Sequence, residues 1–166
     1  MMDGAEILAR LGERFGAALL ETHARHGDPT AVVDRAAISG VLAGCRDTPG
    51  LRFDMLMDLT AVDYLNYPGR EDGARFEVVY HLYSVPHNHR LRLKVPVEED
   101  DPVVPSAVPL WAAADWFERE AWDMFGIRFE GHPDLRRILL YEEFVGHPLR
   151  KDYRINKRQP LIGPKN

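Results

Sequence analysis

Three stretches of the chain alternate between apolar and polar residues, and this alternation limits the possible fold more than any other feature. They cover residues 52–63, 76–83 and 89–95, with a polar loop at 66–73 and a short turn at Pro86 between them. A period of two places successive side chains on opposite faces of a strand. The sequence therefore predicts three strands in an antiparallel meander with one buried and one solvated face.

The apolar residues of each stretch predict which side chains face inward. In the first strand we expect an inward face made of Phe53, Met55, Met57, Leu59 and Ala61. In the second strand the inward set is Phe76, Val78, Tyr80 and Leu82, and in the third it is Leu91, Leu93 and Val95. The other face of the third strand carries Arg90, Arg92 and Lys94, which we expect to be solvated.

Helical periodicity appears in three further places. Leu8, Leu11, Phe15 and Leu19 recur at three- and four-residue steps and predict one amphipathic helix from Ala5 to about His26. After a short strand at 30–33, Asp34 can cap a second helix over residues 35–46. A third helix follows Pro109, covers 115–125 and ends at Gly126. These elements predict an α+β two-layer domain with helices on one face of a mostly antiparallel sheet.

Length and composition indicate a single folded unit. The chain has 166 residues, of which 45% are hydrophobic and 28% charged, as in ordinary globular domains. We interpret Cys45, the only cysteine, as a small core residue. The sequence contains no run of about 18 apolar residues, so we expect no membrane span. The N-terminus is acidic, so we expect no export signal there. We expect one domain over residues 1–145, followed by an extended tail over 146–166.

The charge distribution distinguishes this tail from the rest of the chain. Residues 146–166 hold six bases and one acid, a charge of +5, so residues 1–145 carry −10 of the total of −5. A basic tail beside an acidic body suits contact with a partner surface.

The sequence offers little for catalysis. Phosphate-binding glycine motifs, the G-x-S-x-G elbow and paired cysteines are missing from it. Only Tyr153 in the tail could stack on a nucleic-acid base, so we expect no nucleic-acid binding. A self-contained metal-binding domain stays open as an alternative, built from His87, His89, His132, His147 and Glu120, although no zinc-type spacing links them.

What remains resembles a surface for a protein partner. Glu120 lies on the predicted apolar stripe of the third helix with Trp116 and Met124. Such a carboxylate can pair with an arginine, either in this chain or in a partner. Arginines that pair with carboxylates beside aromatic residues are typical of interfaces, although the same groups can also satisfy one another within one domain.

Two blocks of residues resemble a known family. The first contains Glu118-Arg119-Glu120, Asp123, Met124-Phe125, His132, Arg136, Ile138 and Leu139. The second is Gly146-His147-Pro148-Leu149-Arg150-Lys151-Asp152-Tyr153. Together, over residues 116–153, they are similar to the C-subunit family of proton-pumping NADH:quinone oxidoreductases, respiratory complex I.

The resemblance implies a scaffold subunit of the peripheral arm, with no redox cofactor, metal or catalytic residue of its own. It implies docking on the quinone-site D subunit, with the B and I subunits nearby, at the cytoplasmic face of the bacterial inner membrane. It assigns to the interface and family signature Glu118, Arg119, Glu120, Trp122, Asp123, His132, Arg136, Arg137, His147, Arg150, Lys151, Asp152 and Tyr153. Subunits of membrane-bound hydrogenases and ferredoxin-linked quinone reductases are related, so an equivalent role there is the alternative.

Overall fold

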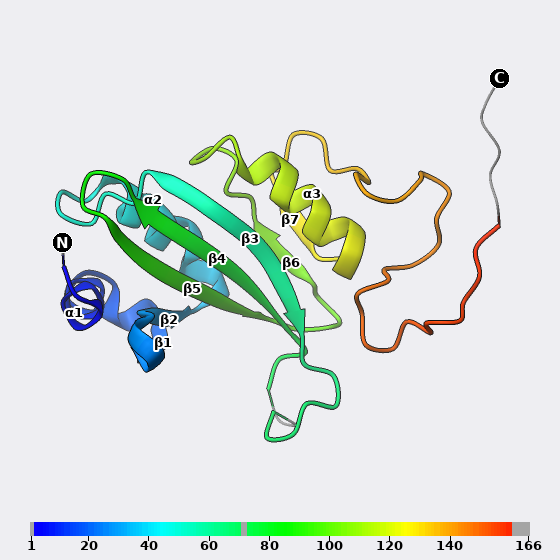
Figure 1. Ribbon diagram of the computed structural model, residues 1–166, viewed down its shortest axis with the longest axis horizontal. Coiled ribbons are helices and arrows are strands. Elements are labelled where there is room, and N and C mark those ends of the chain that lie inside the picture. Colours follow the sequence, from blue (N-terminus) through cyan, green and yellow to red (C-terminus); the bar gives the residue numbers. More distant parts are fainter. Residues whose placement is uncertain (1, 71–72, 161–166) are drawn as a thin grey trace.

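A mixed sheet forms the centre of the computed structural model, which describes residues 2–70 and 73–160 (Figure 1). Within these residues it has five strands in the order β1-β2-β5-β4-β3. Their bounds are β1 Leu19–His23, β2 Thr30–Val33, β3 Met55–Asp63, β4 Phe76–Ser84 and β5 His89–Val97. β3, β4 and β5 pair antiparallel as predicted, whereas β2 pairs parallel with β5. The predicted meander is therefore the larger part of a mixed sheet.

The helices have the bounds α1 Gly4–Phe15, α2 Ile38–Asp47 and α3 Ala114–Phe125. Asp34 caps the turn before α2 as predicted, because its carboxylate accepts the amide of Ala36 at 2.7 Å. Short 3-10 turns lie at η1 Gly16–Ala18, η2 Arg25–Gly27 and η3 Arg35–Ala37. A second, two-stranded parallel sheet joins β6 Val103–Pro105 to β7 Arg128–Glu130 beside α3. The predicted α+β class is confirmed.

The single N-terminal helix predicted over residues 5–26 is wrong. The helix ends at Phe15, and Leu19, which continues the helical spacing, belongs to the edge strand β1. β1 pairs with β2 through a bulge between Leu19 and Glu21, and its middle residues are exposed. An exposed edge strand has little alternation, so its sequence carries no period-two signal.

The inward face predicted for the first strand is also wrong at Met55 and Met57, although Phe53, which precedes β3, is buried as predicted. A bulge between Leu56 and Asp58 adds one residue to β3, so Leu56 is buried and Met55 and Met57 are exposed. A bulge of this kind reverses the side-chain alternation on one side of itself. After the bulge, Leu59 and Ala61 face inward as predicted. The inward sets of β4 and β5 are buried and therefore confirmed.

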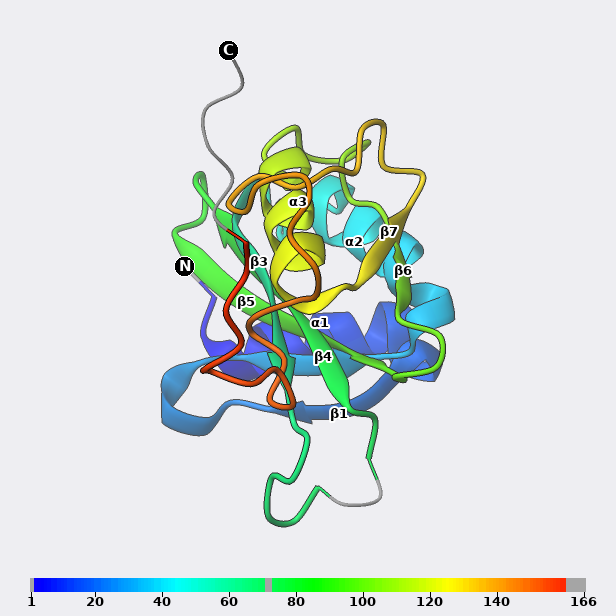
Figure 2. The same ribbon diagram turned by 90° about the vertical axis from the view of Figure 1, so that its right-hand side faces the viewer.

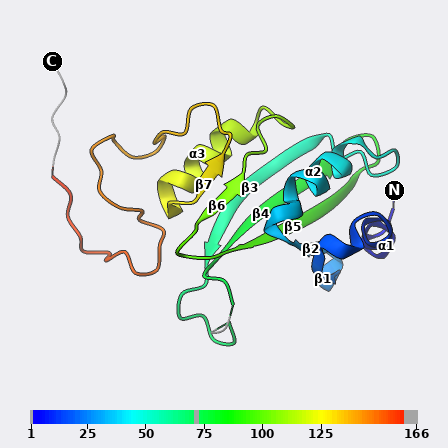
Figure 3. The same ribbon diagram turned by 180° about the vertical axis from the view of Figure 1, so that it is seen from behind.

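One apolar cluster joins the inward face of the sheet to residues of all three helices. Figure 3 shows α2 lying across the sheet, and Figure 2 shows α3 near the strands β6 and β7. Cys45 is fully buried in this cluster, as predicted, and burial raises the pKa of its thiol to about 12. Among the described residues, no helix is long and apolar enough to span a membrane.

Candidate interaction site at the end of α3

The carboxyl end of α3 is closed by a segment that follows it in sequence by more than twenty residues. An α-helix leaves its last four carbonyls without helical partners. Here the amide of Gly126 donates to Trp122 O at 2.8 Å, and that of Leu149 donates to Met124 O at 3.1 Å. His147 Nδ1–H donates to Asp123 O at 3.0 Å, and Arg150 Nε donates to Phe125 O at 2.6 Å. The second signature block therefore caps the helix that carries the first.

Gly126 makes this capping possible. Its φ of 77° lies in the left-handed region that ends many helices. A Cβ at this position would lie 2.7 Å from the His147 ring and 2.9 Å from Arg150 Nη2. The glycine predicted as a helix stop is thus also the residue that lets the second block approach α3.

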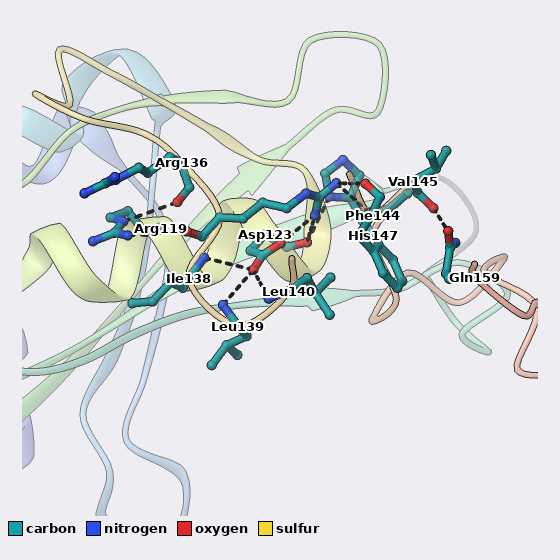
Figure 4. Close-up of polar contacts among 12 residues, drawn as sticks. Arg119, Asp123, Arg136, Ile138, Leu139, Leu140, Phe144, Val145, His147 and Gln159 are labelled. Carbon is teal, nitrogen blue, oxygen red and sulfur yellow. Dashed lines mark hydrogen bonds and ion pairs between the residues drawn. The ribbon is translucent and has the colours of Figure 1, made fainter. Parts of the chain in front are cut away.

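Asp123, near the end of α3, binds the turn at residues 138–140 (Figure 4). Its Oδ2 accepts three consecutive amides, those of Ile138 at 3.1 Å, Leu139 at 2.9 Å and Leu140 at 3.0 Å. Its Oδ1 accepts Arg137 Nη1 at 2.5 Å. Burial opposes the charge of the carboxylate, but these donors outweigh burial and lower the pKa of Asp123 below its ordinary value. A fully buried carboxylate with four donors holds its charge and orders the loop around it.

Arg137 extends this arrangement to the second block. Its Nη2 donates to Phe144 O at 2.8 Å and to Gly146 O at 3.2 Å. Its guanidinium also lies 5.6 Å from the ring centroids of Trp122 and Phe144. Arg137 thus links the helix, the turn at 137–140 and the start of the tail. Its polar contacts lie within its own chain, which is the alternative to a partner contact.

The buried acid of the Glu-Arg-Glu motif is Glu118, and the prediction that Glu120 shares the apolar stripe is wrong. Glu120 is exposed, as is Trp116. Glu118 is fully buried and accepts Ser106 Oγ at 2.7 Å and the amide of Ala107 at 2.6 Å. Burial raises the pKa of Glu118 to about 7. A role for Glu120 toward an arginine of a partner stays a prediction.

Arg119, the middle residue of the Glu-Arg-Glu motif, binds the segment just before the turn at residues 138–140. Arg119 donates to the carbonyls of Arg136 at 3.2 Å and Arg137 at 3.3 Å. The side chain of Arg136 is itself 70% exposed and pairs only with Asp134 among the described residues. Arg136 is therefore available to a partner, whereas Arg119 and Arg137 are largely committed within the chain.

The tail reaches the sheet through a charge cluster that sequence reasoning missed. Arg75 pairs with buried Asp63 at 2.9 Å and with Asp152 at 2.7 Å, and also with Glu99. The amide of Lys151 donates to Asp63 Oδ2 at 2.8 Å. The partners lie far apart in sequence, so no local spacing could have found them. Residues 147–153 thus pack against the body, while residues 161–166 of the predicted tail lie outside the described residues.

Three of the four histidines of the metal-binding alternative bond to backbone carbonyls, and the fourth, His87, stacks on His89. His89 donates to Leu51 O at 2.7 Å, and His132 donates to Asp115 O at 3.2 Å, as His147 does to Asp123 O. In the described part of the chain, no three histidine, cysteine or acidic side chains are grouped as ligands for a metal ion.

Large apolar side chains are exposed around this capped helix. They are Trp116, Leu139, Tyr141, Val145, Leu149 and Ile155. Trp116 is 61% exposed, with the guanidinium of Arg119 lying 5.2 Å from its ring centroid, and Leu139 is 60% exposed. We call these six residues, together with Arg136, the α3 surface. These residues lie on α3 and on the segment that follows it in the sequence, and exposed large apolar side chains near an exposed arginine are typical of protein interfaces.

A family model and individual relatives point to the same protein family. Residues 31–159 match the family described as "Respiratory-chain NADH dehydrogenase, 30 Kd subunit". The chain is 46% identical over 165 residues to the C subunit of the NADH-quinone oxidoreductase of Acidithiobacillus ferrooxidans, covering 98% of this chain and 79% of the relative. It is 47% identical over 164 residues to the protein of that name from Citrifermentans bemidjiense, covering 99% and 94%.

Two solved structures have a similar fold. One is a trypsin-resistant fragment of Nqo5, with a TM-score of 0.69 and 33% identity, covering 80% of this chain and 99% of that one. The other belongs to the membrane-bound sulfane sulfur reductase, an archaeal respiratory membrane complex, with a TM-score of 0.72 and 28% identity. It covers 92% of this chain and 86% of its counterpart.

Proposed function

Because the chain belongs to the family of the 30 kDa subunit of respiratory-chain NADH dehydrogenase, we propose that it is a scaffold subunit of NADH:quinone oxidoreductase. It lies in the peripheral arm of the complex, on the cytoplasmic face of the bacterial inner membrane. It supports electron transfer from NADH to quinone, coupled to proton translocation, by holding neighbouring subunits in position.

The α3 surface is the observation that carries this proposal. It exposes six large apolar side chains, and one of them, Leu139, lies on the turn whose three backbone amides Asp123 binds. A preorganised apolar surface loses little conformational entropy on binding, which favours a stable complex. We assign it to the quinone-site D subunit, with the B and I subunits nearby.

The signature residues then divide into two groups by their contacts. Glu118, Asp123, Arg137, His147 and Arg150 shape the surface from within, since each bonds to its own chain. Glu120, Arg136 and Lys151 are exposed and can meet the partner directly. On this assignment the chain supplies no catalytic residue and no cofactor of its own.

The alternative is an equivalent subunit of another respiratory membrane complex. It is favoured by the fold shared with the archaeal sulfane sulfur reductase complex at 28% identity. The identity to subunits of NADH-quinone oxidoreductases is higher, at 46% and 47%, and supports the first assignment.

Isolation of the tagged chain from native membranes tests the assignment. We expect the quinone-site subunit to copurify in stoichiometric amount, together with subunits that bind NADH. A set that contains hydrogenase or sulfur-reductase subunits instead supports the alternative. The chain purified alone should contain neither flavin nor iron, and a stoichiometric cofactor there contradicts the scaffold role.

A further inference from the structure

Four carboxylates are buried among the described residues, and one of them has no cation beside it. The other three each pair with an arginine, Asp63 at 2.9 Å, Glu77 at 2.8 Å and Asp123 at 2.5 Å. Glu118 is equally buried, but no cation of the described part of the chain pairs with it, and its bonds come from neutral donors. A buried charge without an ion partner is costly, so this site favours the neutral carboxyl.

Glu118 joins α3 to the loop that precedes the helix. We call residues 106–113, between β6 and α3, the entry loop. Ser106 Oγ lies 2.7 Å from Glu118 Oε2, and the amide of Ala107 donates to Oε1 at 2.6 Å. The amide of Val108 donates to Ser106 Oγ at 3.2 Å, and that of Trp111 to Ala107 O at 3.0 Å. One carboxyl therefore holds the two residues around which the loop turns.

The contacts of Glu118 suit the neutral form better than the ionised one. In the neutral form Oε1 accepts the amide of Ala107 and Oε2–H can donate to Ser106 Oγ, because a serine hydroxyl both donates and accepts. The ionised form has the same two neighbours in a site closed to solvent. Tyr80 offers no third donor, since its buried hydroxyl forms no hydrogen bond within the described residues.

The charged and titratable neighbours of the site add to the cost of ionising Glu118. Burial, and to a smaller extent the charge of Asp115 on the same helix, raise the pKa of Glu118 to about 7, against the opposing bonds from Ala107 and Ser106. On β4, burial and then the charge of Glu118 raise the pKa of Tyr80. From α2, Arg46 faces the entry loop, but it donates to Leu110 O at 3.2 Å and pairs with Asp47.

We propose that Glu118 is a pH-dependent switch, whose neutral carboxyl holds the entry loop against α3 and whose ionised form lets the loop open. The inference goes beyond the scaffold function, because it gives the chain a response to pH whichever subunit it binds. Ionisation costs less in an open loop that water reaches, so the open form gains population as the pH rises. With a carboxyl pKa of about 7 in the closed form and about 4.5 in the open form, the opening constant rises about tenfold from pH 6 to pH 8.

Amide hydrogen exchange of the full-length chain, followed by NMR at pH 6 and pH 8, tests the switch. The reporter is the amide of Ala107, with its rate corrected for the intrinsic pH dependence of exchange. We expect its protection to fall about tenfold in the wild type and to stay constant in Glu118→Gln, which cannot ionise. Glu120→Gln, on the exposed side of the same helix, is the matched control and should behave like the wild type. Ser106→Ala removes a bond that lowers the pKa of Glu118, so the fall should continue to a higher pH.

The amides of β4 and β5 distinguish opening of the loop from loss of the whole fold. Ala107 should be less protected than these central strands at both pH values, because the loop opens while the sheet stays closed. Equal protection of Ala107 and the strands overturns the inference, as does protection of wild-type Ala107 that does not change with pH. Both results come from the wild type, so the inference can be refuted even if a variant fails to fold. An equal fall in Glu118→Gln refutes it as well. None of these outcomes involves the quinone-site subunit, so the proposed function is tested separately.

Discussion

At the scale of single residues, the buried acid of the Glu-Arg-Glu motif is Glu118, and not Glu120, which the sequence places on the apolar stripe. Helical spacing groups Glu120 with Trp116 and Met124, which predicts a buried face. In the structure Trp116 and Glu120 are exposed, and Glu118 is buried between α3 and the loop at 106–107. Periodicity identifies which residues share a face, but it cannot tell an exposed tryptophan from a buried one.

Glu118 gives a pH-dependent prediction. Its pKa is raised from 4.5 to about 7, so its contribution to stability is complete below pH 4.5 and is lost as the pH rises through 7. Glu118→Gln cannot ionise, so the variant should gain stability relative to wild type as the pH rises from about 5 to about 8. The gain should be on the order of 3 kcal/mol at most.

Urea unfolding of both proteins at the two ends of this pH range measures the difference. Glu120→Gln on the exposed side of the same helix is the control and should show no such trend. A constant difference between Glu118→Gln and wild type across this range would show that Glu118 does not titrate there.

At the scale of elements, the sequence predicts the third helix well and its cap not at all. The stop at Gly126 follows from local backbone chemistry, which a short stretch of sequence records. The bonds from His147, Leu149 and Arg150 to the helix carbonyls are tertiary contacts with no local spacing. The two signature blocks resemble a family pattern in the sequence, but only the fold shows that one block caps the other.

Two arginines of these blocks should therefore behave differently. Arg150→Ala removes the bond to Phe125 O and the packing of the guanidinium 5.1 Å from the Phe76 ring centroid. It should lower the free energy of unfolding by roughly 1.5 to 3 kcal/mol. Arg136→Ala removes an exposed side chain and should change stability by less than about 0.5 kcal/mol.

Thermal melts combined with copurification of the quinone-site subunit separate these effects. We expect Arg136→Ala to melt like the wild type and to assemble less. If Arg136→Ala lowers the melting temperature as much as Arg150→Ala does, the exposed position of Arg136 is contradicted.

At the scale of the whole molecule, the sequence predicts the class and the central strands but not the long-range pairings. Alternation recovers β4 and β5, yet it cannot show that β2 joins β5 in parallel. The cluster of Asp63, Arg75 and Asp152 brings together residues from distant parts of the chain and leaves no periodic trace. Charge alone predicts an extended tail, whereas residues 147–153 are bound to the body.

Truncation distinguishes the bound part of the tail from the rest. A chain that ends at residue 153 keeps the caps of α3 and the Arg75–Asp152 pair, so it should melt close to the full-length chain. A chain that ends at residue 145 loses three helix caps and the pair, and should lose about 2 to 4 kcal/mol of stability. Calorimetry of the three chains measures this, and equal melting of all three supports a domain boundary at 145.

The central claim is that the α3 surface holds the quinone-site subunit, and two matched leucines test it most directly. Leu139 on this surface and Leu20 on β1 are each 60% exposed, so substitution by Asn should leave both variants stably folded. Isothermal calorimetry with the purified quinone-site subunit then compares their affinities. We predict that Leu139→Asn binds about tenfold more weakly than wild type, a loss of about 1.4 kcal/mol, while Leu20→Asn binds unchanged. Unchanged binding by Leu139→Asn, or an equal loss in both variants, contradicts the claim.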